Sequence, residues 1–309
     1  MIVTLTINPA IDRNVTADRL VFEDRAYIVS TTVSAGGRGI NASCVINSFG
    51  RPTEAVLTCG GESGRRLDSL LANCGFPVIA VPVASETRTN LTITDRHGLT
   101  VKLNEVGAPL HKEELDRIEQ VVEENLAGAS WLMLCGSVPP GVPAGFYAKL
   151  IRSAQRADVS TLLDTDGEAL REGIEAGPTA VAPNQHETER LLSRALLTRN
   201  QFLEAALAVR EMGAQSVIMS LGSRGAIGAA EECLVEVLPP RIDSVCPIGA
   251  GDAMAAAFTW ALDRGNDFPD AVRWGVAAGT ASARLPGLSF ASLAQTEEIY
   301  RQVEVRRAA

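Results

Sequence analysis

Short runs of apolar and β-branched residues alternate with longer amphipathic stretches along most of the chain. The apolar runs predict strands over residues 2–7, 55–58, 77–83, 130–135, 159–164, 178–182 and 215–221. The amphipathic stretches predict helices over residues 63–74, 111–126, 143–156, 185–192, 199–212, 251–264, 268–283 and 295–305. This alternation is typical of a three-layer αβα fold, in which helices cover both faces of a mostly parallel sheet.

Two regions interrupt the alternation. Residues 14–16 and 27–33 have β character with no helix between them, and residues 87–95 and 99–105 flank a typical hairpin turn at 95–98. We therefore predict a single domain over residues 1–309 with a small accessory β-sheet. Its strands are inserted from about 14–33 and 87–105, and the sheet is expected to be a lid, a dimer surface, or both.

Composition narrows the range of partners. The chain has 309 residues, 28 Lys and Arg against 37 Asp and Glu, a formal net charge of −9, and 46% apolar residues. The acidic balance argues against nucleic acid as a partner but allows a small anionic substrate held locally. The longest uncharged apolar stretch, 253–262, is far short of the roughly 20 residues of a membrane span, and the first residues lack a basic signal-peptide region. We expect a cytoplasmic protein without a membrane partner.

The six cysteines show no C-x-x-C spacing, and the three histidines are scattered. This pattern predicts reduced and mostly buried thiols and gives no indication of a zinc site.

The strongest candidate for chemistry is the segment 247–258. Gly249 and Gly251 flank Ala250, and Asp252 follows at the start of an Ala-rich helix. Glycines permit a sharp turn that exposes N–H groups, which form an anion site together with a helix N-terminus. We expect Asp252 to stay ionised there and to act as general base for a hydroxyl beside a phosphoryl group. The alternative is that Asp252 only caps a buried helix.

A second glycine-rich segment, 34–41, contains Arg38 and precedes a helical pattern that extends to Phe49. Arg38 is a candidate phosphate ligand, and the alternative is a flexible turn into a helix. Residues 37–42 also match the G-x-G-x-x-A dinucleotide pattern, which would indicate a nicotinamide-dependent dehydrogenase. That pattern belongs after the first strand of a βαβ unit, whereas an apparently antiparallel region intervenes here.

Two more segments allow a functional and a structural interpretation. Asn184 and Glu187, spaced i, i+3 at a helix start, present an amide and a carboxylate that suit a hydrated Mg²⁺, or they form a helix cap. The loop 220–226 fits over nucleotide phosphates, or it is a tight hairpin that leads into residues 226–237.

Polar side chains also follow other predicted strands. Asp12 lies just beyond the first strand, where α/β sheets bind ligands, or it is an exposed loop acid. Arg88 and Asn90 alternate on a predicted strand, as in a solvated strand face, and Ser137 lies in the strand-end loop 136–141. Because polar loops recur after successive strands, we expect one ligand crevice at that edge of the sheet. The sequence contains no G-x-x-x-x-G-K-[ST] motif, so it is not a P-loop enzyme.

With these motifs in this order, the sequence resembles the ribokinase-like (PfkB) family of carbohydrate kinases. Residues 36–41 are similar to the family's N-terminal signature, and residues 247–258 are similar to its C-terminal signature. Residues 8–12, 87–90 and 136–141 are more similar to the 1-phosphofructokinase and tagatose-6-phosphate kinase branch than to ribokinase or adenosine kinase.

The resemblance implies a role for each matching position. Asp252 would be the catalytic base, with an anion hole at Gly249, Ala250 and Gly251. The implied substrate ligands are Asp12, Gly37, Arg38, Asn41, Arg88, Asn90 and Ser137, with Arg38 and Arg88 on the substrate's own phosphate. The implied nucleotide ligands are Asn184, Ser220, Gly222, Gly225 and Gly251. Mg²⁺ would be held indirectly, through water, by Asn184 and Glu187.

Two positions depart from the family pattern: Arg38 stands where this branch usually has Lys, and Ala182 stands where the family often has Lys before Pro-Asn. The resemblance implies an ATP- and Mg²⁺-dependent kinase of fructose 1-phosphate, tagatose 6-phosphate or fructose 6-phosphate, with a homodimer through the lid as a further option. The alternatives are a kinase of a non-phosphorylated sugar or nucleoside, and a catalytically weak ligand sensor, which Ala182 would favour.

Overall fold

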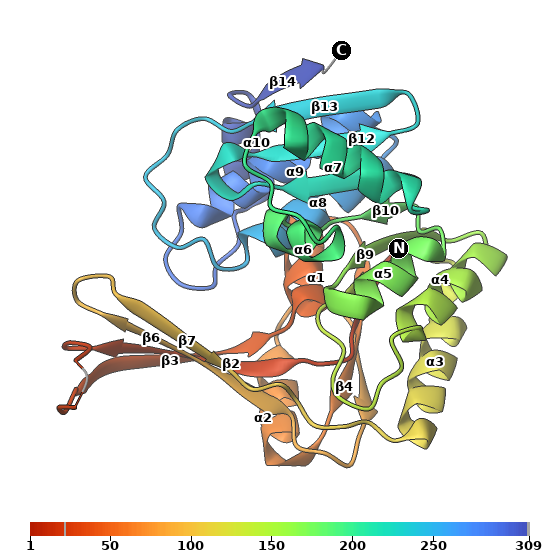
Figure 1. Ribbon diagram of the computed structural model, residues 1–309. Helices are drawn as coiled ribbons and strands as arrows, with labels where there is room; N and C mark the ends of the chain where they lie inside the picture. Colours follow the sequence, from red (N-terminus) through yellow and green to blue (C-terminus); the bar gives the residue numbers. More distant parts are fainter. Residues whose placement is uncertain (22, 308–309) are drawn as a thin grey trace.

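The computed structural model describes residues 1–21 and 23–307. Residue 22, which falls in the predicted lid segment 14–33, and residues 308–309 lie outside the described part. A ten-stranded sheet runs through the body in the order β14-β13-β12-β11-β10-β9-β8-β1-β4-β5 (Figure 1). Its strands are β1 (Ile2–Thr6), β4 (Thr53–Cys59), β5 (Val78–Pro82), β8 (Trp131–Cys135), β9 (Ser160–Asp164), β10 (Ala180–Val181), β11 (Val217–Ser220), β12 (Ala226–Ala230), β13 (Cys233–Leu238) and β14 (Glu304–Arg307).

The sheet is parallel from β11 to β5, whereas β12, β13 and β14 are added antiparallel at one edge. Strands buried on both faces have nearly continuous apolar sequences, as β8 has between Trp131 and Cys135. The apolar runs of the sequence therefore predicted the parallel part of this sheet correctly.

Helices cover both faces of the sheet and give the predicted three layers. One layer comprises α3 (Lys112–Leu126), α4 (Phe146–Arg156), α5 (Gly167–Glu175), α6 (Gln185–Leu191) and α7 (Arg199–Glu211). The other comprises α1 (Arg38–Ser48), α2 (Gly61–Leu71), α8 (Ala250–Asp263), α9 (Phe268–Ala283) and α10 (Leu293–Tyr300). Each layer buries its apolar stripe against one sheet face, so Ile118 of α3 and Phe258 of α8 are fully buried on opposite sides.

A separate four-stranded sheet extends away from the body (Figure 1). Its strands are β2 (Ala10–Ala17), β3 (Ile28–Gly36), β6 (Arg88–Asp95) and β7 (Thr100–Asn104), in the order β3-β2-β6-β7. The register pairs Asp12 with Asn90 on one face, and Ile93 with Val15 and Val101 on the other. The sheet therefore has one polar and one apolar face. The predicted hairpin turn is confirmed, because the Gly98 N–H donates to the Asp95 carbonyl at 3.1 Å.

Two expectations about elements and one about the cysteines were wrong. Helix α5 lies between β9 and β10, where no helix was predicted, because its nine residues are too few for a clear periodicity. The helix expected over 295–305 ends at Tyr300, and residues 304–307 pair with β13 as strand β14. Burial of the thiols was also overestimated. Cys135 is buried, but the other five cysteines of the described chain are partly exposed, and all six are unpaired.

Within residues 1–21 and 23–307, no helix has the length and apolar character needed to cross a membrane.

Candidate active site

The parallel strands end at one edge of the sheet, and polar residues follow them there. Asn8 comes after β1, Ser137 after β8, Asn184 after β10, and Asp164 and Ser220 close β9 and β11. Because parallel strands share the direction of their carboxyl ends, these residues converge from distant parts of the sequence. The base of the separate sheet adjoins the same edge, since β2 begins four residues after β1 ends. The expected crevice is therefore a place where the two sheets meet.

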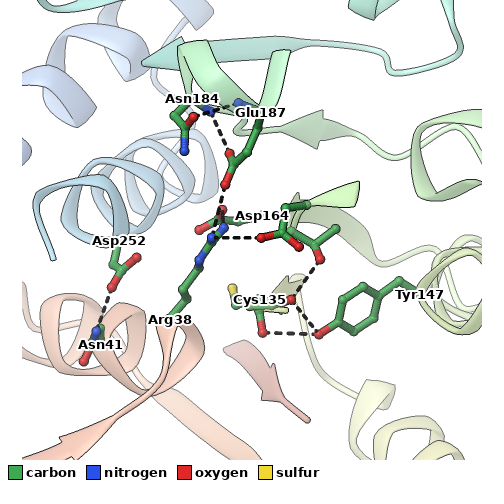
Figure 2. A network of polar contacts seen from close by, with 11 residues as sticks. Arg38, Asn41, Cys135, Tyr147, Asp164, Asn184, Glu187 and Asp252 are labelled. Carbon is green, nitrogen blue, oxygen red and sulfur yellow. Dashed lines mark hydrogen bonds and ion pairs between the residues drawn. The ribbon is translucent and has the colours of Figure 1, made fainter. Parts of the chain in front are cut away.

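Asp252 lies in the first turn of α8, at the junction of several elements. Gly249 caps the helix with a φ of 79°, which is a left-handed conformation that favours glycine. A Cβ at Gly249 would also stand 2.8 Å from a Leu288 methyl group. The Asn41 Nδ2 donates a 2.6 Å hydrogen bond to Asp252 Oδ2, which links α8 to α1 (Figure 2). Asp252 thus has a defined partner inside the site, and the alternative that it only caps the helix is wrong, because Gly249 is the N-cap and α8 has no side-chain cap hydrogen bond.

The protonation of Asp252 differs from the sequence-based expectation. Burial, and after it the negative charge of Asp164, raise the pKa of its carboxyl from an ordinary 3.8 to about 7, against the opposing effects of Asn41 and Arg38. The carboxylate is therefore not fixed in the ionised form at neutral pH. Loss of solvation outweighs the helix N-terminus that suggested permanent ionisation. A pKa near the working pH suits a general base.

Arg38 is surrounded by carboxylates. Its Nη1 lies 2.7 Å from Asp164 Oδ1, and its Nη2 lies 3.1 Å from Glu187 Oε1 (Figure 2). The Nη2 also lies 3.9 Å from Asp166 Oδ2. Asp164 and Glu187 raise the pKa of Arg38 well above its ordinary value despite burial. The guanidinium expected to hold the substrate's phosphate is thus engaged with acids in this structure. Sequence reasoning missed Asp164 and Asp166, although their position directly after an apolar run was the available signal.

Asn184 and Glu187 form the helix cap that was the structural alternative. Asn184 Oδ1 accepts from the Glu187 N–H at 2.9 Å, and Glu187 Oε2 accepts from the Asn184 N–H at 2.8 Å. Since Glu187 Oε1 accepts from Arg38, both carboxylate oxygens have protein donors. Burial raises the pKa of Glu187, and Arg38 opposes that shift.

The side-chain oxygens around Asn184 and Glu187 decide how this site could bind Mg²⁺. In the described part of the chain, no three His, Cys, Asp or Glu side chains are grouped as direct metal ligands. Asn184 is paired with Glu187, and Arg38 joins Glu187 to Asp164, so oxygen-bearing side chains adjoin one another here; oxygen ligands with retained water suit Mg²⁺. The residues fit a cation held through its water shell, and they do not fit a cation held directly by Glu187.

The polar face of the small sheet forms the other side of the site. Asp12 is a partly buried residue of strand β2, so the alternative of an exposed loop acid was wrong. Its Oδ1 accepts from Asn90 Nδ2 at 2.8 Å, and burial raises its pKa, with Asn90 and Arg88 opposing. A Cβ added at Gly36 would stand 2.3 Å from the Asp12 carboxyl carbon, so any side chain there would displace that carboxyl. Within the described residues, Ser34 Oγ, Asn90 Oδ1 and Arg88 Nε are buried without hydrogen-bond partners, so donors and acceptors remain available for a polar ligand.

The remaining predicted substrate residues lie around this face. Gly37 is the N-cap of α1 with a φ of 140°. Arg88 donates from Nη1 to the Glu105 carbonyl at 2.8 Å, and desolvation lowers its pKa. Ser137 Oγ accepts from Asn8 Nδ2 at 3.1 Å.

A cavity of about 790 Å³ adjoins the start of α8, where it is lined by Ala250 and Gly251, the two residues before Asp252. It lies between the turn after β11 and the segment that leads into α8. Its lining includes Ser220, Gly222, Gly225, Arg241, Asp243, Ala250, Gly251, Met254, Val276 and Thr280. The turn is the tight hairpin into β12 that was the structural alternative, and it also lines the cavity. The volume falls in the range of small-molecule and cofactor sites. Asn184 pairs with Ser220 beside it but does not line the cavity.

Comparisons with known proteins agree over nearly the whole chain. A family model described as pfkB family carbohydrate kinase matches residues 2–295. The ATP-dependent 6-phosphofructokinase isozyme 2 of Escherichia coli (strain K12) is 34% identical over 302 residues, 97% of this chain and 97% of the relative. The 1-phosphofructokinase of Borreliella burgdorferi is 31% identical over 284 residues, 92% of each. The structure of the tetrameric inhibited form of phosphofructokinase-2 from Escherichia coli has a TM-score of 0.89 at 33% identity, and the match covers 97% of this chain and 98% of that chain.

Proposed function

The chain belongs to the pfkB family of carbohydrate kinases, and on that premise we propose that it transfers the γ-phosphoryl group of ATP to a hydroxyl of a phosphorylated ketohexose. As a member of this family it is a phosphotransferase that acts on an alcohol group. The two relatives are named for different fructose phosphates, so fructose 6-phosphate and fructose 1-phosphate are candidate acceptors, and the sequence resemblance adds tagatose 6-phosphate.

The observation that carries the proposal is the position of Asp252 between the large cavity and the polar face of the small sheet. Ala250 and Gly251, directly before it, line the large cavity. Asn41, which holds its carboxylate, belongs to the helix that follows the polar face of the small sheet. A donor nucleotide in the cavity and a sugar on the polar face would meet at Asp252. In-line transfer between two bound substrates requires this arrangement.

In the proposed reaction, Asp252 takes the proton of the acceptor hydroxyl while the hydroxyl oxygen bonds to the γ-phosphorus of ATP. The bond from that phosphorus to the oxygen that bridges it to the β-phosphorus breaks, and ADP leaves. The N–H groups of Gly249, Ala250 and Gly251 would hold the phosphoryl oxygens. The Ala250 N–H donates to the Pro247 carbonyl at 3.2 Å in this structure, so that bond has to yield when the anion binds. Mg²⁺, held through water by Asn184 and Glu187, would neutralise phosphate charge.

The acceptor would be bound by the residues of the polar face. Asp12 and Asn90 have the carboxylate and amide that accept and donate hydrogen bonds to sugar hydroxyls. Arg88, with a buried free Nε, is the better candidate for the substrate's own phosphate, since Arg38 is engaged with Asp164 and Glu187. Arg38 would instead act near the transferred group, beside Asp252.

We also propose that the small sheet is a lid that excludes water and that its apolar face pairs with a second copy of the chain. Val101 and Leu103 of β7 are 39% and 55% exposed on this face. Exposed apolar sheet faces favour association. A structural neighbour is described as a tetramer, which is consistent with an assembling family.

The test is an ADP-release assay with Mg²⁺-ATP and six acceptors: fructose 1-phosphate, fructose 6-phosphate, tagatose 6-phosphate, fructose, ribose and adenosine. We expect turnover on one or more of the phosphorylated ketohexoses and none on the other three. Turnover only on a free sugar or on adenosine would refute the substrate class. ATP binding without turnover on any of the six would refute the proposed acceptor class and favour a ligand sensor or an untested acceptor.

A further inference from the structure

Asn8 connects three segments of chain at the edge of the site. It follows β1, and its side chain is buried at 7% exposure. Its Nδ2 donates to the Val106 carbonyl at 3.0 Å and to Ser137 Oγ at 3.1 Å. Both N–H groups of the amide therefore have acceptors, one in the segment that leaves β7 and one in the loop that follows β8.

The amide oxygen of Asn8 is also closely packed. Gly107, next to Val106, has a φ of 96°, and a Cβ added there would stand 2.4 Å from Asn8 Oδ1. Any side chain at residue 107 would displace the amide. The chain is thus built to bring this amide against residues 106–107.

The segment held by Asn8 also holds Arg88. The Glu105 carbonyl, one residue before Val106, accepts from Arg88 Nη1 at 2.8 Å, and Glu105 Oε2 accepts from the Thr89 N–H at 2.8 Å. Asn8 and Arg88 also line the same small cavity of about 20 Å³. A displacement of residues 105–107 would therefore move the guanidinium of Arg88.

We propose that Asn8 is the positioning residue of the acceptor site. It would hold Ser137 directly and Arg88 through residues 105–107, and through the short link 8–12 it would fix the start of β2 that carries Asp12. This inference rests on the proposed function, since these three residues are its proposed sugar-phosphate ligands. No step of the reaction needs Asn8 itself, so its contribution is to the geometry with which the acceptor is bound.

The test compares Asn8→Ala and the isosteric Asn8→Asp, which lacks the donor N–H groups, with wild type. Asn125→Ala is the matched control, because Asn125 Nδ2 also donates to a backbone carbonyl, at 2.8 Å, but within α3. We expect the KM for the best sugar-phosphate acceptor to rise about tenfold in both Asn8 variants, while kcat falls less and the KM for ATP stays within about twofold. The control should leave all three constants unchanged.

A double-mutant cycle with Ser137→Ala separates positioning from a general loss of stability. If Asn8 acts partly through Ser137, the double variant should lose less than the product of the two single effects. An unchanged acceptor KM, an equal rise in the KM for ATP, or a purely multiplicative cycle would overturn the proposal. Failure of both Asn8 variants to fold would also overturn it, because Asn8 would then be a residue of the fold. If wild type phosphorylates none of the sugar phosphates, the proposed function fails first, and this inference fails with it.

Discussion

Replacing Asp252 with Asn should remove activity and stabilise the protein in the same step. The carboxyl has a pKa of about 7 in the folded chain, against an ordinary 3.8, because burial and Asp164 disfavour its charged form. The folded state therefore binds more protons than the unfolded state between about pH 4 and pH 7. Over that range stability falls as pH rises, and the full penalty is present above pH 7.

The size of the penalty follows from the pKa difference. A difference of about three units, at about 1.36 kcal/mol for each unit, corresponds to an upper limit of about 4 kcal/mol. Asp252 retains some contact with solvent, which screens the charge, so we expect about half of that limit. An Asn side chain keeps an oxygen to accept from Asn41 and carries no charge. The variant should therefore be about 2 kcal/mol more stable than wild type at pH 8 and less than about 1 kcal/mol more stable at pH 5, because most of the penalty builds up between pH 5 and pH 7.

Urea unfolding at pH 5, 6.5 and 8 measures this difference directly, and ADP release with the best acceptor measures turnover in the same preparations. Loss of a general base should reduce kcat about 10²- to 10⁴-fold. Asn266→Ala is a matched control outside the site, since Asn266 Nδ2 donates to the Asp270 carboxylate at 2.6 Å. Equal stability of Asp252→Asn and wild type at pH 8 would refute the raised pKa. Near-normal turnover would refute the role of base, whichever way stability changes.

Three more changes test other parts of the proposal. Arg38→Met leaves Asp164 and Glu187 without their cation, so we expect the free energy of unfolding, measured in urea, to fall by about 2 kcal/mol. Because Arg38 lowers the pKa of Asp252, its loss should also shift the acidic limb of the pH profile of kcat to higher pH. An unchanged profile would show that Arg38 does not act on Asp252. Arg88→Ala should raise the KM for the sugar phosphate at least tenfold with little change for ATP in steady-state kinetics, and an equal effect on both substrates would contradict its assignment. Leu103→Asp should reduce the mass in sedimentation from a dimer to the 32.7 kDa chain, and a monomeric wild type would refute the lid interface.

The fold was largely predictable because its main determinants are local. Buried parallel strands such as β8 consist of uninterrupted apolar residues, and amphipathic helices such as α3 repeat every three to four positions. Both patterns can be recognised in a single sequence. Helix α5 and strand β14 are short, and their pairing or packing comes from distant elements, so the local pattern was too weak to identify them.

The chemistry of the site was predictable by residue type, whereas its pairings were not. The glycine-framed Asp252 and the strand-end polar residues could be found because turns and helix starts have recognisable sequences. The bond from Asn41 to Asp252 joins residues 211 positions apart, and the pair of Arg38 with Glu187 spans 149 positions. Contacts at such separations depend on how helices pack on the sheet. The pKa of Asp252 depends on the resulting burial, which is why the expectation of an ionised carboxylate failed.

The two departures from the family pattern converge in the structure. Ala182 is buried, two residues before the cap formed by Asn184 and Glu187, so position 182 supplies no cation there. Arg38, on a different helix, places its guanidinium 3.1 Å from Glu187, at the same turn. A positive charge therefore reaches this turn from α1 instead of from the strand that precedes it. A bulky guanidinium bound to two acids is less free to move than an ammonium on a flexible stem. The absence of Lys at 182 is therefore weak support for a sensor without catalysis, because the site retains a cation beside Asp252.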